Sequence, residues 1–153
     1  NQTVLYVKEH YARLGHRETV FYRALKKYPN VRLINPLTSI YDLILKSDGV
    51  ITLSGTSGWE AMLLGKPVYL LGNVFYQSFK YINKIDNINE LTNSIKSTDL
   101  EFYKSSYYQD ELIKYVACYL KTLSKGNYLL GYDGFMSDSN VDDLANNLIS
   151  EVS

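Results

Sequence analysis

Short apolar runs alternate with helical patterns through the first 100 residues of the chain. Runs rich in β-branched and aromatic residues predict buried strands over residues 3–7, 31–34, 50–53 and 67–71, with a candidate fifth strand at 81–85. Apolar residues at helical spacing predict helices over residues 18–28, 40–45, 59–64 and 88–95. Thr38 or Ser39 is expected to cap the second helix, and Gly65 to end the third.

This alternation predicts an α/β fold, because strands separated by helices form parallel sheets with right-handed crossovers. We expect a Rossmann-like parallel sheet of four to five or more strands, with helices on both faces. Residues 101–124 are predicted to add one or two helices, and Ser139 or Asn140 to cap a last helix over 141–152. Residues 1–153 would then form a single domain in which 101–153 is mostly helical, a length that suits one core.

Polar residues follow three of the predicted strands, at the edge where open parallel sheets bind their ligands. Lys8, Glu9 and His10 follow the first strand, residues 35–39 follow the second, and residues 54–60 follow the third. His10 could bind a phosphate or donate a proton to a leaving group, and Lys8 could neutralise a phosphate. The alternative is a surface histidine at the end of a strand for His10, and a solvated lysine, which the local pattern favours, for Lys8.

The third group is the most informative, because five small residues join the strand to the helix: Ser54, Gly55, Thr56, Ser57 and Gly58. Glycines allow close approach of a ligand, N–H groups at a helix start suit phosphate oxygens, and hydroxyls add further donors. Glu60, in the first turn of the predicted helix, suits a carboxylate that accepts hydrogen bonds from ribose. The alternative is an ordinary helix cap, with Ser57 as the N-cap and Glu60 completing a capping box.

Composition narrows the classes of function. Lys and Arg total 16 and Asp and Glu total 16, so we expect no nucleic-acid partner held by overall charge. The single cysteine cannot form an internal disulfide, and no Cys/His cluster predicts zinc. We therefore expect neither a metal nor a cofactor. The segment 54–58 is not a Walker A loop, and no nucleophile elbow or HExxH motif is found.

The location is predicted from the absence of long apolar runs. No run approaches the roughly 20 residues that span a bilayer, and no signal peptide is visible. We expect a cytoplasmic protein, with the inner face of the membrane as the alternative. The sequence opens in a strand-like segment without an initiator Met, so we also expect a fragment whose N-terminal partner domain is missing.

The sequence from VKEH to GNVFY resembles the bacterial capsule polysaccharide synthesis family, whose members include the Kdo transferases that start the capsule lipid linker. The resemblance runs from about residue 4 to residue 76, and its most specific part contains SDGVIT, SGTSGWEA and GKPV. It implies a GT-B architecture, in which two Rossmann-like domains face a cleft. This chain would be the C-terminal half, which binds the nucleotide sugar, and would lack the N-terminal acceptor domain.

The resemblance also implies roles for individual residues. His10 matches a histidine that contacts the nucleotide in related CMP-sugar transferases, and Ser54, Thr56 and Ser57 match a serine-containing motif that does the same. Glu60 matches a carboxylate that commonly meets the ribose.

The region near the base would contain Pro36, Thr38 and Ser39. Here Tyr11 follows His10, where the family usually has proline, so the sequence departs from the family pattern at this turn. The catalytic carboxylate expected from the N-terminal domain is not in this chain.

The predicted function is therefore binding of a nucleotide-sugar donor, CMP-Kdo by resemblance, for transfer to a glycan or glycolipid acceptor in capsule or surface polysaccharide synthesis. The nucleotide sugar is a substrate, and GT-B transfer needs no bound metal. Peripheral association with membrane-bound polysaccharide machinery would follow. Two alternatives remain: half of a UDP-sugar transferase or UDP-sugar 2-epimerase, and a non-catalytic partner-binding module, which the tyrosines of residues 102–123 suggest.

Overall fold

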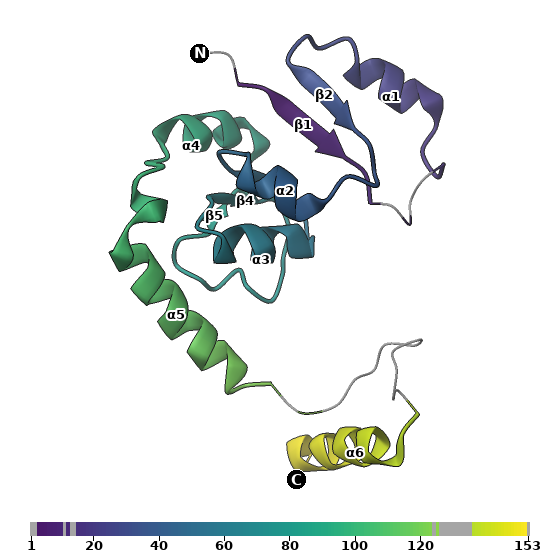
Figure 1. The fold of residues 1–153 in the computed structure, drawn as a ribbon, viewed down its shortest axis with the longest axis vertical. Helices are drawn as coiled ribbons and strands as arrows, with labels where there is room; N and C mark the ends of the chain where they lie inside the picture. Colours follow the sequence, from purple (N-terminus) through teal and green to yellow (C-terminus); the bar gives the residue numbers. More distant parts are fainter. Residues whose placement is uncertain (1–2, 11, 13–14, 124, 126–135, 153) are drawn as a thin grey trace. The chain divides into compact units, whose positions relative to one another are not determined.

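A computed structural model describes residues 3–10, 12, 15–123, 125 and 136–152 of the chain (Figure 1). The chain divides into two compact units between Ser105 and Ser106. The described strands all belong to the first unit, whereas the second contains the helices α5 (Ser106–Leu120) and α6 (Asp138–Val152).

The first strand pair consists of β1 (Leu5–Lys8) and β2 (Val31–Ile34), which run parallel and side by side (Figure 1). Leu5 pairs with Val31 and Lys8 with Ile34, so the carboxyl ends of both strands meet at one edge. The helix α1 (Thr19–Leu25) lies in the connection between them. Prediction placed the second strand at these bounds and the first within a residue or two of its position.

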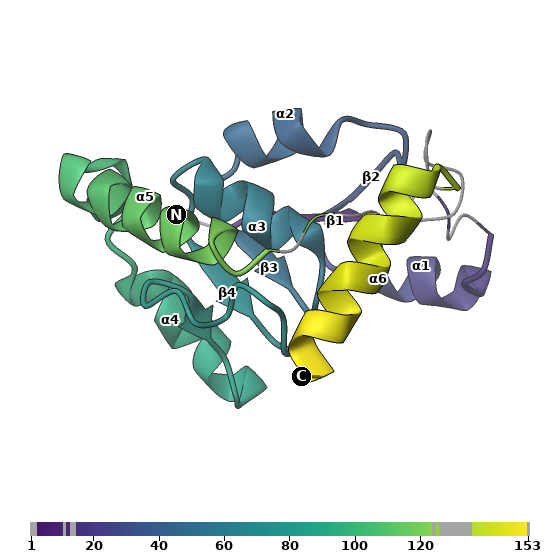
Figure 2. The same ribbon diagram turned by 90° about the horizontal axis from the view of Figure 1, so that it is seen from below.

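A second parallel sheet contains β3 (Val50–Thr52), β4 (Val68–Leu70) and β5 (Asn83–Lys84), in that order. The central strand β4 is buried along its whole length, as is typical of a parallel strand covered on both faces. The helix α3 (Thr56–Leu63) packs on β3 and β4 and also contacts α2 (Ile40–Leu45) (Figure 2).

The apolar core of the first unit surrounds this central strand. Its buried side chains come from α2, α3, β4 and the segments around β5: Ile44, Ala61, Met62, Val68, Tyr69, Leu70, Tyr76, Phe79, Ile85 and Tyr103. The position of these residues explains why α3 is held firmly against β3 and β4.

The predicted α/β class with parallel strands is confirmed, but the single sheet of four to five strands is wrong. The described strands form one sheet of two and one of three. The apolar pattern defines each strand locally, whereas the pairing of strands depends on contacts between segments far apart in the sequence. The apolar pattern therefore predicted where the strands lie in the sequence, but not which strands pair with one another.

Side-chain caps and one glycine define several of the helix boundaries. The Ser39 hydroxyl accepts a hydrogen bond from the Asp42 N–H at 3.3 Å, which confirms it as the N-cap of α2. Gly65 follows α3 with a φ of 65°, in the left-handed region that glycine adopts without strain. The side chain of Asn87 accepts from the Asn89 N–H at 3.0 Å and begins η2 (Ile88–Glu90), which continues into α4 (Leu91–Ser97).

The described part of the second unit is mostly helical. The last helix begins at Asp138, earlier than predicted, and Ser137 rather than Ser139 or Asn140 provides the cap, since its hydroxyl accepts from the Asn140 N–H at 3.3 Å. Most of the loop predicted over 125–139 lies outside the described residues. None of the helices that the structure describes combines the length and the apolar character needed to cross a membrane.

Candidate functional site

The turn between β3 and α3 is shorter than the sequence predicted. The strand ends at Thr52 and the helix begins at Thr56, so only Leu53, Ser54 and Gly55 connect them. The helix had been predicted to begin at Trp59. Its first turn is rich in small polar residues, whose low helix propensity concealed the true start.

The alternative of a capping box is therefore wrong. Gly55 is the N-cap of α3 and no side chain caps the helix, while Ser57 lies inside it. The first turn contains no acidic residue, because Glu60 falls in the second turn. Glu60 remains one turn beyond Thr56 on the same helix face.

The start of α3 leaves backbone donors available for a ligand. The N–H groups of Thr56 and Ser57 have no carbonyl within the helix to which they could donate. The Gly58 N–H turns back to the Gly55 carbonyl at 3.2 Å. The side chains of Ser54 and Thr56 are exposed and that of Ser57 is half-buried, so hydroxyls lie beside these N–H groups.

Two hydrogen bonds fix the conformation of Gly55. The Thr52 hydroxyl accepts from the Gly55 N–H at 3.0 Å, and the Tyr76 hydroxyl donates to the Gly55 carbonyl at 2.6 Å. Tyr76 is only 1% exposed, and burial raises the pKa of its hydroxyl, which therefore stays a donor at neutral pH. The ring of Tyr76 also lies near those of Trp59 and Phe75, with centroids 6.1 and 5.1 Å away.

Two glycines make this arrangement sterically possible. A Cβ atom on Gly58 would lie 2.2 Å from the Tyr76 hydroxyl oxygen, so no larger residue fits beside that ring. A Cβ atom on Gly72 would lie 2.4 Å from the Leu53 carbonyl oxygen. The segment after β4 therefore packs directly against the β3–α3 turn.

A cavity of about 500 Å³ lies at the carboxyl ends of β1 and β2. Three residues of the predicted site, Lys8, His10 and Pro36, line it. Apolar side chains from β1, β2 and α1 form much of the remaining wall: Val7, Phe21, Leu33 and Ile34. The sequence had placed these strand ends near a ligand, and the structure does bring their side chains around one cavity.

A charged network forms one side of this cavity. The Glu9 carboxylate accepts from the Arg17 Nε at 2.6 Å and from the Tyr22 hydroxyl. The hydrogen bond from Tyr22 and, to a smaller extent, the one from Arg17 hold the pKa of Glu9 below its usual value. The bond between Tyr22 and Glu9 also raises the pKa of Tyr22. The Arg17 guanidinium also lies 4.8 Å from the centroid of the Phe21 ring.

The predicted site residues thus fall into two groups. Lys8, His10 and Pro36 line the cavity beside β1 and β2, whereas residues 54–60 belong to the β3–α3 turn and the start of α3. Thr38 and Ser39 are exposed, and Ser39 serves as a helix cap. The structure does not draw these two groups into one cavity.

The sequence analysis did not identify the residues that hydrogen-bond to the β3–α3 turn or to Glu9 beside the cavity. Thr52 and Tyr76 fix the β3–α3 turn, and Arg17 and Tyr22 bind Glu9 beside the cavity. Tyr76 lies 21 residues from the glycine that it contacts, so no local pattern reports the contact. Gly72, a few residues before Tyr76, is the local feature that could have indicated this packing, because a glycine often marks a place where two backbone segments lie close together.

Comparison with known proteins extends the family resemblance beyond residues 4–76, on which the sequence analysis based it. Residues 1–122 of the 153 match the family described as "Capsule polysaccharide biosynthesis protein". Searches of curated proteins and of solved structures gave no match. The match covers both sheets, the β3–α3 turn and α5. This chain belongs to the capsule polysaccharide biosynthesis protein family.

Proposed function

We propose that this chain binds the nucleotide-sugar donor of a glycosyltransferase that acts in capsule polysaccharide synthesis. The start of α3, where no side chain caps the helix, is the observation that carries this proposal. Family membership supports a role in capsule polysaccharide synthesis. The β3–α3 turn supports anion binding, because N–H groups at the start of α3 are available to donate. The chain would form one Rossmann-like half of a GT-B enzyme, and the other half would supply the acceptor site and the catalytic carboxylate.

The donor phosphate would lie against the first turn of α3. The N–H groups of Thr56 and Ser57 and the hydroxyls of Ser54 and Thr56 would donate to its oxygens. The helix dipole favours negative charge at this end, and no acidic residue of the first turn opposes it. The hydrogen bonds that Gly55 makes with Thr52 and Tyr76 organise the turn before a ligand binds, which reduces the entropy lost on binding.

Other residues would contact the rest of the donor. Glu60 shares a helix face with Thr56 and is half-buried, which suits a carboxylate that accepts from ribose hydroxyls. His10 and Lys8 would stabilise the departing nucleotide phosphate, and the cavity beside them, with Pro36, would accept the base. We propose CMP-Kdo as the donor and a glycan or glycolipid as the acceptor, at the cytoplasmic face of membrane-bound machinery.

Titration of the chain with CMP and with UDP, followed by two-dimensional amide NMR, tests this proposal. We expect CMP to bind more tightly than UDP and to shift the amide resonances of Thr56 and Ser57. Tighter binding of UDP would favour half of a UDP-sugar transferase or epimerase instead. If neither nucleotide bound, the result would favour a non-catalytic, partner-binding module instead.

Substitution of one hydroxyl identifies the phosphate site. Thr56→Ala is expected to weaken CMP binding about tenfold, which equals about 1.4 kcal/mol, because a hydrogen bond to a charged group is lost. Thr92→Ala, at an exposed position of α4, is the matched control and should leave affinity unchanged. Equal CMP affinities for the two variants would contradict the assignment of the phosphate site to the β3–α3 turn.

A further inference from the structure

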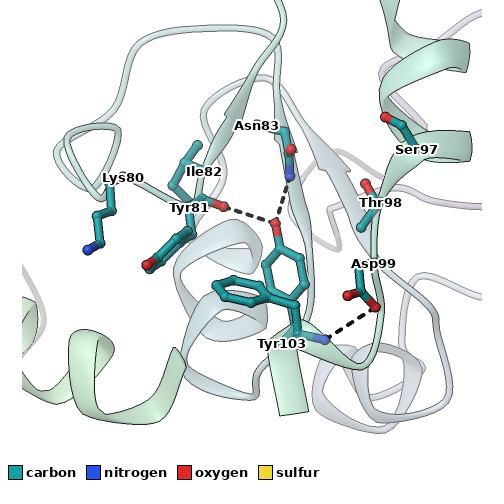
Figure 3. A pocket seen from close by; sticks show the side chains of 9 residues that line it. Lys80, Tyr81, Ile82, Asn83, Ser97, Thr98, Asp99 and Tyr103 are labelled. Atoms are coloured by element: carbon teal, nitrogen blue, oxygen red, sulfur yellow. Dashed lines mark hydrogen bonds between the residues drawn. The ribbon is translucent and has the colours of Figure 1, made fainter. Parts of the chain in front are cut away.

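A second cavity, of about 400 Å³, lies between β5 and the segment that follows α4 (Figure 3). Lys80 and Tyr81 lie on one side and Asp99 on the other, while Asn83 and the hydroxyl of Tyr103 lie between them. Its volume falls within the range of small-molecule sites in proteins. None of the residues assigned to donor binding lines it.

Hydrogen bonds hold the floor of this cavity in one arrangement. The Tyr103 hydroxyl donates to the Tyr81 carbonyl at 3.2 Å and accepts from Asn83 Nδ2 at 3.1 Å (Figure 3). The same Nδ2 donates its other hydrogen to the Val68 carbonyl at 3.2 Å. The amide nitrogen of Asn83 is therefore fully used, and its side-chain carbonyl oxygen takes part in neither bond and keeps its capacity to accept.

Asp99 supplies a second acceptor. One of its carboxylate oxygens, Oδ1, accepts from the N–H groups of Glu101 and Phe102 at 3.0 and 3.4 Å. The other oxygen receives no hydrogen bond from the part of the chain that the structure describes. Acceptors thus come from the Asp99 side and from the middle of the cavity, and the Lys80 ammonium on the opposite side provides donors.

Aromatic rings complete the lining. The rings of Tyr81 and Phe102 meet edge to face with centroids 4.8 Å apart, and both side chains are half-buried. The Lys80 ammonium lies 4.9 Å from the centroid of the Tyr81 ring, and the lysine is exposed. Aromatic surface beside uncommitted acceptors suits a ring that has C–H groups on its faces and hydroxyl donors at its edge.

We propose that this cavity binds a neutral saccharide residue of a glycan. Sugar hydroxyls would donate to the Asn83 carbonyl and to the free Asp99 oxygen, and the sugar would pack on the rings of Tyr81 and Phe102. A nucleotide phosphate fits less well, because the Asn83 carbonyl and the Asp99 carboxylate are acceptors and offer no hydrogen to phosphate oxygens.

The saccharide cavity is separate from the proposed donor site. A Cβ atom on Gly65 would lie 2.8 Å from the Tyr103 carbonyl oxygen, so the wall of the cavity lies at the C-terminal end of α3. The β3–α3 turn lies at the other end, and an eight-residue helix spans about 12 Å. The cavity would therefore hold a glycan at a distance from the reacting sugar.

Titration of the full chain with neutral methyl glycosides tests the proposal by amide NMR. The probes are the methyl β-glycosides of galactose, glucose and N-acetylglucosamine. At least one is expected to give saturable shifts at Asn83, Asp99 and Phe102, with a dissociation constant in the millimolar range. The absence of saturable shifts with all three probes would overturn the proposal.

Asp99→Asn isolates the free carboxylate oxygen. Asparagine keeps one oxygen to accept from the N–H groups of Glu101 and Phe102, but replaces the other with an amide donor. Sugar affinity should fall at least tenfold, while Asp86→Asn, at an exposed position outside the lining, should leave it unchanged. Equal sugar affinity in these two variants would contradict the assignment.

A second variant guards against misfolding of the first. Lys80→Ala changes an exposed side chain and should weaken sugar binding by removing donors on one side of the cavity, without a change in thermal unfolding. Unchanged sugar affinity in this variant would count against the site. The donor proposal is judged separately, since CMP is expected to shift Thr56 and Ser57 and to leave Asn83 and Asp99 unaffected.

Discussion

At the scale of single residues, the conformation of the β3–α3 turn depends on the contact between Gly58 and Tyr76. Gly58→Ala would place a methyl group 2.2 Å from the Tyr76 hydroxyl oxygen and 2.9 Å from its ring carbon Cζ. The buried ring must shift, and its hydrogen bond to the Gly55 carbonyl would be lost. We expect a loss of about 1–3 kcal/mol in the free energy of unfolding, measured by urea denaturation.

A double-mutant cycle separates this steric effect from a general loss of helix stability. Tyr76→Phe removes the closest atom and should itself cost about 1 kcal/mol through the lost hydrogen bond. In the Tyr76→Phe background, Gly58→Ala should cost less than in the natural chain, because part of the overlap has gone. Additive costs would show that the two residues do not act through their contact.

At the scale of elements, Glu9 joins the end of β1 to α1 through Arg17 and Tyr22. Folding lowers the pKa of Glu9 below its ordinary value of 4.5, so the ionised carboxylate stabilises the folded state above that pH. This contribution is lost as the pH falls through the lower folded-state pKa. Urea unfolding of Glu9→Gln from neutral pH to below pH 4.5 should therefore show a weaker dependence on pH than the natural chain.

Glu18→Gln is the matched control for this measurement. Glu18, the N-cap residue of α1, makes no capping hydrogen bond with its side chain and takes no part in the bonds to Glu9, so Glu18→Gln removes a nearby carboxylate that lies outside the network. An identical pH profile for Glu9→Gln and the natural chain would show that the network with Arg17 and Tyr22 contributes nothing to folding.

Also at this scale, the sequence predicted the features that depend on neighbouring residues. The strand Val31–Ile34, the Ser39 cap and the glycine after α3 follow from local pattern, and each is confirmed. The start of α3 was missed because packing against Tyr76 overrides the low helix propensity of Gly58. Sheet pairing and the bond from Tyr76 to Gly55 depend on distant segments, which a local pattern does not report.

At the scale of the whole molecule, burial is concentrated around β4 and is low around β1. Val68 and Leu70 are 1% and 0% exposed, whereas Leu5 and Tyr6 of β1 are 39% and 52% exposed. Local opening requires less free energy where fewer apolar contacts are broken. The two sheets should therefore differ in their protection against hydrogen exchange, even though both are parallel.

Three backbone amides provide a matched comparison of the two sheets. The N–H groups of Leu71 and Ile85 donate to carbonyls at 2.9 Å beside β4, and that of Leu5 donates at 2.8 Å beside β1. Because their hydrogen bonds are alike in length, different exchange rates would report the stability of the surrounding structure. Native-state exchange measured by NMR should be slowest at Leu71 and Ile85 and at least tenfold faster at Leu5, whereas equal protection would require β1 to gain a packing partner in solution.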